Sequence, residues 1–238
     1  MKMVNISVCM ATYNGSKYIK EQLDSILMQL SDDDEVIVSD DGSIDNTLEI
    51  IKTYNDVRIK IFKNSFKNLI LNFEFAISKA SGNYIFLSDQ DDIWMGNKVS
   101  VMMKELQSSD LVITDAQIID AKGEILSESY YEINKSTRNF FSNLIINSYL
   151  GCALAYKASM NSYILPFPKS IPMHDIWIGN VISLKGKMTF LDDKLIKYRR
   201  HGGNASPTGE KSTFSFSYKI LYRVRLINSL INRLVLKK

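Results

Sequence analysis

Cysteine and proline are scarce in this sequence, and their scarcity excludes several classes of protein. The two cysteines among 238 residues, Cys9 and Cys152, are too few for a disulfide framework or a four-cysteine zinc site, and we expect both to be buried small hydrophobic residues. Four prolines and eleven glycines exclude a collagen-like or proline-rich architecture. The first eight residues contain no apolar signal core, so we expect a cytoplasmic protein in a reducing compartment.

The sequence also lacks a long apolar run. The uncharged stretch Phe140–Tyr156 is shorter than the roughly 20 apolar residues that a bilayer requires. Four polar side chains interrupt it: Ser142, Asn143, Asn147 and Ser148. We therefore expect no membrane span here, but a helix near Arg138–Asn147 followed by a strand at Cys152–Tyr156.

Acidic residues are absent from one end of the chain. The net charge is +3, but residues 211–238 contain seven lysines and arginines and no aspartate or glutamate, which leaves 22 basic against 26 acidic residues in the rest. This acidic body argues against a nucleic-acid-binding surface, so we expect no nucleic-acid partner. We predict a domain over residues 1–210, followed by a basic helix over residues 211–238 that attaches the protein locally.

Short β-branched runs alternate with amphipathic segments in the first half of the chain. The predicted strands lie at Ile6–Met10, Val36–Val38, Ile59–Phe62, Tyr84–Leu87 and Leu111–Ile113. Apolar residues at helical spacing follow the first three strands, and Asp45 with Asn46 is the expected cap of the second helix. This alternation is typical of an α/β protein with a mostly parallel sheet flanked by helices.

The second half follows a different pattern. A hairpin turn is expected at Asp120–Gly123, a helix from about Asp175 and a final strand at Leu195–Tyr198.

The loops at the carboxyl ends of parallel strands are the expected ligand-binding loops. The segment Asp89–Asp92 follows one strand, and carboxylates two residues apart can converge there on one divalent cation; a solvated turn that caps the next helix is the alternative. Asp40 and Asp41 follow another strand, where a carboxylate can bind ribose hydroxyls or a base N–H; the alternative is a plain Asp-Gly turn.

The loop Thr12–Ser16 has neither the G-x-G-x-x-G pattern nor a P-loop lysine. Together with four further segments, it resembles the bacterial family 2 glycosyltransferases with the GT-A fold, in particular a rhamnosyltransferase-like subgroup of polysaccharide biosynthesis. The matching segments, which cover roughly residues 4–204, are Ala11–Gly15, Ser39–Ser43, Ser88–Trp94, Met173–Trp177 and Tyr198–Gly202. The resemblance implies a nucleotide-sugar half over about 1–115 and an acceptor half over about 116–210.

The resemblance also implies roles for individual residues. The residues that would bind the nucleotide sugar are Thr12, Tyr13, Asn14, Asp40, Asp41 and Asp89, with Arg199 or Arg200 on the phosphates. The residues that would bind Mn²⁺ or Mg²⁺ are the D-x-D pair Asp89 and Asp91, joined by His201. Trp94 and Trp177 would either stack on sugars or pack in the core.

Asp175 matches the family's catalytic base. It would take a proton from the acceptor hydroxyl on the face opposite the departing diphosphate, as a carboxylate activates water in inverting glycoside hydrolysis. The alternative role of Asp175 is to cap the helix that it begins. His174 stands where the wider family often has an acidic residue.

The function implied by the resemblance is a metal-dependent, inverting transfer from a UDP- or dTDP-linked sugar, with dTDP-rhamnose as one candidate. The acceptor would be a glycan or lipid-linked oligosaccharide in O-antigen or capsule synthesis. Two alternatives stay open: a non-catalytic sugar-nucleotide-binding module, which would not need the base, and a nucleotidyltransferase, which would carry a glycine-rich basic loop after the first strand. A processive synthase would need transmembrane helices and a Q-x-x-R-W segment, and neither occurs in this sequence.

The basic end of the chain has a helical apolar stripe. Its members are Ile220, Val224, Ile227, Ile231 and Leu234. A basic amphipathic helix over 214–238 predicts binding to an anionic membrane surface, which would place the protein on the inner face of the plasma membrane. The alternative is that the stripe packs on the body or on a second subunit of a homodimer.

Overall fold

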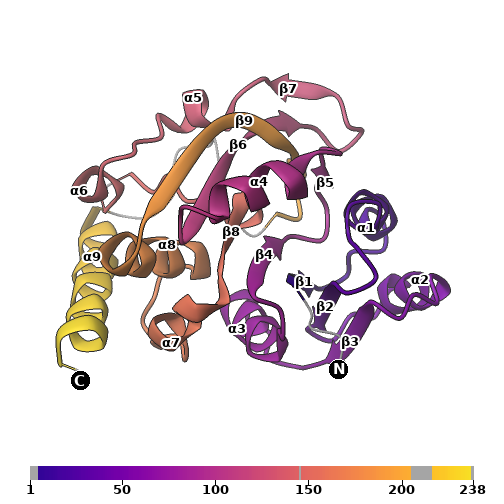
Figure 1. The fold of residues 1–238 in the computed structure, drawn as a ribbon, viewed down its shortest axis with the longest axis horizontal. Coiled ribbons are helices and arrows are strands. Elements are labelled where there is room, and N and C mark those ends of the chain that lie inside the picture. Colours follow the sequence, from indigo (N-terminus) through magenta and orange to yellow (C-terminus); the bar gives the residue numbers. More distant parts are fainter. Residues whose placement is uncertain (1–4, 145, 205–215, 237–238) are drawn as a thin grey trace.

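The structure is a computed structural model that describes residues 5–144, 146–204 and 216–236. A nine-stranded sheet runs through the molecule with helices on both sides (Figure 1). Its strands are β1 (Ile6–Thr12), β2 (Glu35–Asp40), β3 (Ile59–Lys63), β4 (Tyr84–Ser88), β5 (Ile93–Trp94), β6 (Leu111–Ile119), β7 (Ile125–Ser127), β8 (Leu154–Lys157) and β9 (Met188–Arg199).

The longer helices are α1 (Ile19–Leu27), α2 (Thr47–Thr53), α3 (Leu69–Lys79), α4 (Lys98–Leu106), α8 (His174–Lys185) and α9 (Phe216–Ile231). Shorter helical pieces are α5 (Tyr130–Asn134), α6 (Phe140–Asn143), α7 (Asn161–Ile164), the 3₁₀ turns η1 (Gly151–Ala153) and η2 (Ala158–Met160), and the π-helical turn η3 (Asn232–Leu236).

The sheet has the strand order β3-β2-β1-β4-β8-β6-β9-β5, and β7 pairs with β6. Strands β3, β2, β1 and β4 are parallel, β8 is antiparallel to both of its neighbours, and β6 is parallel to β9. The predicted α/β class with a mostly parallel sheet is therefore confirmed, as are the five predicted strands of the first half.

The register of the parallel strands brings their carboxyl ends to one edge. Thr12 on β1 pairs with Asp40 on β2, and Met10 pairs with Ser88 at the end of β4. The loops that follow these three strands, which carry the motifs singled out in the sequence, thus leave the sheet at the same edge.

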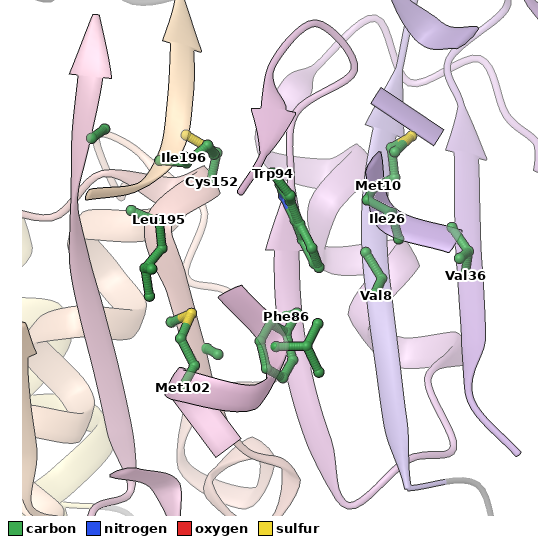
Figure 2. Packing of buried hydrophobic residues seen from close by; sticks show 14 of the residues in the cluster. Val8, Met10, Ile26, Val36, Phe86, Trp94, Met102, Cys152, Leu195 and Ile196 are labelled. Atoms are coloured by element: carbon green, nitrogen blue, oxygen red, sulfur yellow. The ribbon is translucent and has the colours of Figure 1, made fainter. Parts of the chain in front are cut away.

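The hydrophobic core has two parts, one on each face of the sheet. Alternation along β1 sends Val8 and Met10 to one face and Cys9 to the other. The first face is covered by α1, α2 and α4, and Figure 2 shows Ile26 of α1 and Met102 of α4 among its buried side chains. The second face is covered by α3, α8 and α9.

The predicted helix near Arg138–Asn147 is wrong in length. Helix α6 spans Phe140–Asn143 only. The Asn143 side chain donates to Thr137 O at 2.9 Å and accepts from Ser148 N at 3.1 Å, so it holds the surrounding backbone in a non-helical loop.

The other elements predicted in the second half differ from the structure only at their ends. The strand expected from Cys152 begins at Leu154, because residues 151–153 form the turn η1. The final strand, β9, is longer than expected because it pairs along the whole of β6. The hairpin turn at Asp120–Gly123 joins β6 to β7 as predicted. The N-cap residue of α2 is Asn46, whose side chain makes no cap bond, and Asp45 before it accepts from Thr47 N at 3.0 Å.

Helix α9 packs on the body through one face. Leu226 and Leu230 are buried in the second core cluster. Arg223 donates to Leu144 O at 3.0 Å, and Arg233 donates to Leu165 O at 2.8 Å, which ties the helix to the chain near α6 and α7. Among the residues that the structure describes, no helix is both long enough and apolar enough to cross a bilayer.

Candidate active site

A cavity of about 730 Å³ opens at the carboxyl ends of β1, β2 and β4. The predicted site residues among its lining are Thr12, Tyr13, Asp41, Asp89, Asp91 and Asp175. The far wall comes from the second half of the chain and from α9, which contributes Tyr222. The cavity therefore joins the two halves that the motifs come from.

Asp40 organises the loop that follows β2. Its carboxylate accepts from the Thr12 hydroxyl at 2.9 Å, from Ser43 N at 2.9 Å and from the Ser43 hydroxyl at 2.6 Å. It is fully buried and lies outside the cavity lining. Its hydrogen bonds hold the β1 and β2 loops together, so Asp40 supports the site from behind.

Asp41 faces the cavity, but both carboxylate oxygens already accept backbone bonds. Lys67 N donates at 2.9 Å and Asn68 N at 2.8 Å. Asn68, in turn, caps α3 through its side chain, which accepts from Leu71 N at 3.1 Å. Asp41 thus fixes the loop before α3 as a third wall of the cavity.

Tyr13 and Asn14 form the turn after β1. Tyr13 is 56% exposed, and Gln90 holds its backbone by accepting from Tyr13 N at 2.9 Å and donating to Tyr13 O at 3.0 Å. Asn14 has a φ of +48° and accepts from Ile44 N at 2.9 Å, outside the cavity lining. Asn14 therefore shapes the loop, and Tyr13 presents its ring to solvent at the cavity.

The three aspartates in the loop after β4 differ in where they lie. Asp89 and Asp91 line the cavity, whereas Asp92 is fully buried. One oxygen of Asp92 accepts from Arg199 N at 2.9 Å. Asp92 does not cap the next helix, because β5 intervenes and α4 begins only at Lys98.

Burial disfavours the charged forms of the carboxyl groups in this acidic loop. Burial and the charges of Asp92, Asp91 and Asp175 raise the pKa of Asp89, and burial together with Asp91 raises the pKa of Asp92 to about 7. The cation facing Asp89 and Asp92 is Lys98, whose pKa burial lowers to about 8 and whose ammonium donates to Cys152 O at 2.6 Å.

The donor atoms fit a hard divalent cation. Ligand atoms of Asp89, Asp92 and Cys152 lie within 4.8 Å of one another. Burial raises the pKa of the Cys152 thiol well above its usual range, so the sulfur stays protonated and the carboxylate oxygens are the available ligands. Asp91 stands beside this group and accepts from His201 Nε2 at 2.7 Å and from Asn204 Nδ2 at 3.3 Å.

Asp175 is the second residue of α8 and lies in the cavity wall. Burial raises its pKa to about 7, against hydrogen bonds from Ile176 N at 2.7 Å, Asn147 and Gly151. The N-cap of α8 is Met173, so Asp175 is not the helix cap. A carboxylate with this pKa can accept a proton near neutral pH.

His174 precedes Asp175 and is 4% exposed at the cavity wall. Its ring stacks on Phe73 at 3.9 Å between centroids, and neither ring nitrogen has a hydrogen-bond partner among the residues that the structure describes. Burial lowers its pKa to about 3, so the ring is neutral. A Cβ on Gly151 would lie 2.8 Å from His174 Nε2, so the ring occupies the space that a larger residue at 151 would need.

Arg199, which ends β9, and Arg200, which follows it, make different contacts. Arg199 is 2% exposed and donates to Glu21 at 2.5 Å and to Asp91 O at 2.7 Å, outside the cavity lining. Arg200 donates to the hydroxyl of Tyr198, which lines the cavity, at 3.3 Å. Both arginines therefore contact a residue of the cavity wall: Arg199 braces the acidic loop at Asp91, and Arg200 lies beside Tyr198.

The family follows from comparison with known proteins. The sequence model that describes glycosyl transferase family 2 matches residues 7–165 of this chain, from β1 through α7. This chain is a family 2 glycosyltransferase.

Its relatives are bacterial. The glycosyltransferase is 27% identical over 246 residues to the dTDP-rhamnosyl transferase RfbG of Shigella flexneri, covering 91% of this chain and 79% of RfbG. It is 29% identical over 170 residues to the Escherichia coli UDP-Glc:α-D-GlcNAc-diphosphoundecaprenol β-1,3-glucosyltransferase WfgD, covering 68% of this chain and 64% of WfgD. The resemblance that the motifs indicate is thus confirmed at the level of the family.

Solved structures with the same fold include TarS 1–349 of S. aureus in complex with UDP-GlcNAc. Its TM-score is 0.74 at 19% identity, over 97% of this chain and 68% of that one. The mannosyltransferase PcManGT of Pyrobaculum calidifontis, in complex with GDP-Man and Mn²⁺, has a TM-score of 0.62 at 17% identity, over 98% of this chain and 65% of that one. At these identities the likeness shows the fold, which is GT-A.

The structure adds residues that sequence reasoning missed in this glycosyltransferase. Gln90 lies inside the acidic segment Asp89–Asp92, and its side chain joins this segment to the loop after β1 by bonding to the Tyr13 backbone. Its place inside the motif is the one signal in the sequence that could have indicated this contact. Lys98 gave no such signal, because a lysine at the start of an amphipathic helix is usually solvated, yet it is fully buried here. Trp94 and Trp177 are 2% and 0% exposed and pack in the core, and Cys9 and Cys152 are buried as expected.

Proposed function

We propose that this glycosyltransferase transfers a sugar, with inversion, from a UDP- or dTDP-linked donor to an acceptor hydroxyl, with Mn²⁺ or Mg²⁺ bound at the acidic loop. The observation that carries the proposal is that Asp175 and the pair Asp89 and Asp91 line one cavity. That cavity begins at the β1 and β2 loops and so has room for a nucleoside at one end and an acceptor at the other.

The nucleoside would occupy the end formed by Thr12, Tyr13 and Asp41. The exposed Tyr13 ring offers a stacking surface for a base, and Asp41 lines the same wall. Asp40 and Asn14 would act by holding these loops in place through the hydrogen bonds described above. Arg200 is the better candidate for a phosphate contact, because the Arg199 guanidinium is committed to Glu21 and Asp91 O.

The metal would be held by Asp89 and Asp91, with His201 next to Asp91 as a further ligand. The Asp92 carboxylate, whose ligand atom lies within 4.8 Å of that of Asp89, would add another oxygen. When bound, such an ion supplies Lewis-acid stabilisation of the charge that develops on the departing diphosphate. Lys98, which is fully buried and faces Asp89 and Asp92, would hold these two carboxylates in position.

Asp175 would serve as the base of the transfer step. The acceptor oxygen forms a bond to the anomeric carbon of the donor, the bond from that carbon to the diphosphate oxygen breaks, and the electron pair leaves with the diphosphate. The acceptor proton passes to the Asp175 carboxylate, whose pKa of about 7 suits it to this task.

Donor and acceptor are proposed from relatives. RfbG is named a dTDP-rhamnosyl transferase, and WfgD is named for a UDP-glucose donor and a diphosphoundecaprenol-linked acceptor. We therefore propose dTDP-rhamnose or a UDP-hexose as the donor and a lipid-linked or growing glycan as the acceptor, in surface polysaccharide synthesis.

The donor test is a thermal-shift panel of dTDP-, UDP- and GDP-sugars with and without Mn²⁺, followed by a transfer assay with the donors that bind. Donor binding to the folded state raises the melting temperature by mass action. We expect a metal-dependent rise with a dTDP- or UDP-sugar. A rise with no transfer or hydrolysis of any donor would contradict the catalytic proposal and favour a binding module.

The metal test compares Asp91→Ala with Asp193→Ala, which removes an exposed carboxylate on β9. Loss of a metal ligand should lower transfer by at least about 10²-fold. The control should keep wild-type activity. Full activity of Asp91→Ala in the presence of EDTA would refute the metal site.

A further inference from the structure

Helix α9 has two apolar faces, and the described part of the body, residues 5–144 and 146–204, covers one of them. Leu226 and Leu230 are 1% and 5% exposed against the second core cluster. The other face carries five large aliphatic side chains that are each 40–48% exposed: Ile220, Leu221, Val224, Ile227 and Ile231. Four of these recur at intervals of four and three residues, so they form a continuous stripe along the helix. We call these five residues the α9 stripe.

The stripe that the sequence singled out is therefore not the face that packs on the body. Of its five predicted members, Leu234 contacts the second core cluster and the other four belong to the α9 stripe. Helix α9 is held on the body by other groups: Ser229 lies 3.2 Å from Ser170, and Arg233 donates to Tyr163 O at 3.0 Å. Its position is thus fixed while the stripe stays at the surface.

Exposed apolar side chains also occur on the segments next to α9. Phe141 of α6 is 74% exposed, and the Arg223 bond to Leu144 O places α9 beside the end of α6. Tyr163 of α7 is 42% exposed at the other end of α9, where its carbonyl accepts from Arg233. Figure 1 shows α9 at one side of the molecule, with α6 near the start of the helix. Grouped aliphatic and aromatic exposure of this kind marks an interaction surface.

We propose that the α9 stripe docks on an anionic lipid bilayer and lies in its interface. The charge of the segment selects this partner, because residues 211–238 carry seven basic and no acidic residues and Arg225 is exposed on α9. A basic helix with an apolar face and no membrane span binds the surface of an anionic bilayer. Two copies of this helix would instead bring like charges together with no acidic residue of the segment to pair them, which disfavours a homodimer through this face.

The docked helix would also border the active-site cavity. Tyr222 lines the cavity, and its neighbour Leu221 belongs to the α9 stripe. A bilayer at the stripe would therefore lie close to the part of the cavity wall that Tyr222 forms. This part of the inference rests on the proposed function: a lipid-linked acceptor could reach the cavity without leaving the membrane.

Vesicle flotation of the full chain tests the docking. We expect flotation with vesicles of phosphatidylglycerol and phosphatidylcholine, less with phosphatidylcholine alone, and weaker binding at high salt. The variant Val224→Glu/Ile227→Glu places two charges in the stripe and should weaken binding at least about tenfold. The matched control, Met28→Glu/Val57→Glu, adds the same charges at exposed apolar residues 75% and 93% exposed near α1 and β3 and should float like wild type.

A second measurement does not depend on those variants. In Ile227→Trp, a tryptophan replaces a side chain of the stripe, while the two natural tryptophans are buried and give a constant background. Its emission should shift to shorter wavelength with anionic vesicles and be quenched by brominated lipid. An unshifted emission, or equal failure of wild type and Val224→Glu/Ile227→Glu to float, would overturn the proposal. A wild-type dimer that this double variant converts to a monomer, without flotation, would assign the stripe to a second copy.

The docking surface and the proposed function can be refuted independently of each other. A protein that floats but transfers no sugar would refute the proposed function and leave the docking surface standing. If both hold, Val224→Glu/Ile227→Glu should lose transfer to a vesicle-borne acceptor and keep transfer to a water-soluble one.

Discussion

His174 and Asp175 are adjacent residues at the cavity wall whose burial moves their pKa values in opposite directions. Burial favours the neutral form of each group, so the pKa of Asp175 rises to about 7 and the pKa of His174 falls to about 3. This pair of residues is therefore neutral at mildly acidic pH and gains a negative charge near neutrality, when Asp175 ionises. Each shift links the stability of the fold to pH, with opposite sign.

Asp175→Asn should lower transfer by about 10²–10⁴-fold, because it removes the proton acceptor while keeping the size of the side chain. Wild-type transfer should rise as the pH increases through about 7, where Asp175 ionises. Initial rates at saturating donor across pH 5.5–8.5 check this. Asp193→Asn, at an exposed position, is the control. Transfer by Asp175→Asn near the wild-type rate would place the base elsewhere.

The same variant should be more stable than wild type above pH 7. A carboxyl whose pKa is higher in the folded than in the unfolded protein costs stability once the unfolded chain ionises, so the cost grows from about pH 4 to 7 and then stays constant. Asp175→Asn avoids this cost, which is on the order of 2–4 kcal/mol. Urea unfolding in EDTA at pH 4 and pH 8 measures it; an equal difference at both pH values would contradict the linkage.

His174→Asn should show the opposite trend. A histidine whose pKa is lowered in the folded protein costs stability as the pH falls below about 6.5, where the unfolded chain takes up the proton. At pH 7 the variant should be about 1 kcal/mol less stable, because it loses the stack on Phe73. Between pH 7 and pH 4 the difference should move in favour of the variant by roughly 2–3 kcal/mol. Urea unfolding at the two pH values is the measurement, and a pH-independent difference would show that the folded protein protonates this ring.

At the scale of elements, Glu35 joins the parallel strands at the end opposite the cavity. It is buried at the start of β2 and accepts from the Ser7 hydroxyl of β1 at 2.6 Å and from Ser81 N, just before β4, at 2.7 Å. It also pairs with Lys60 of β3. Burial alone would raise the pKa of Glu35, but the hydrogen bonds from Lys60, Ser7 and Ser81 outweigh it and lower the pKa.

Glu35→Gln should cost about 2 kcal/mol of unfolding free energy at pH 7, since it removes a charged acceptor of several bonds. The folded-state pKa lies below the unfolded one, so this contribution is present above about pH 4 and is lost as the pH falls further. Chemical denaturation across pH 3–7 tests both points. Glu49→Gln, exposed on α2, should change little. An equal effect of both substitutions would show that the bonds from Glu35 to Ser7, Lys60 and Ser81 add no stability.

At the scale of the whole molecule, α9 is part of the body rather than a separate appendage. Its Leu226 lies in the same cluster as Trp177 of α8 and Ile85 of β4. Leu226→Ala should destabilise the whole protein by about 2–4 kcal/mol, whereas Ile227→Ala on the exposed stripe should have little effect. Calorimetry should show one transition for wild type and both variants. A separate low-temperature transition that moves only in Leu226→Ala would show that α9 unfolds independently.

Much of the first half of the fold could be predicted from local pattern. Short apolar runs such as Val36–Val38 carry their own signal because they are buried on both faces of the sheet. Amphipathic segments such as that of Ile19 and Leu23 carry theirs because one helix face is buried against the sheet. The helix near Arg138–Asn147 could not be predicted, since side chains such as Asn143 end it by bonding to backbone several residues away. The placement of Lys98 and Arg199 depends on partners far along the chain: Cys152 O for Lys98 and Glu21 for Arg199.

The sequence by itself determined the family, the fold class and the loops at which the site is built, because motif order and hydrophobic period are local properties of the chain. Tertiary structure alone decided which motif residues face the cavity. Asp41 and Asp91 line the cavity, whereas Asp40 and Asp92 lie outside its lining and hold the loops through hydrogen bonds to backbone N–H groups. Neighbouring carboxylates after a strand point in different directions, so their partners depend on which segments the sheet brings close. It also decided that the apolar stripe of α9 faces outward, because packing on the body uses Leu226 and Leu230 on a different face of the same helix.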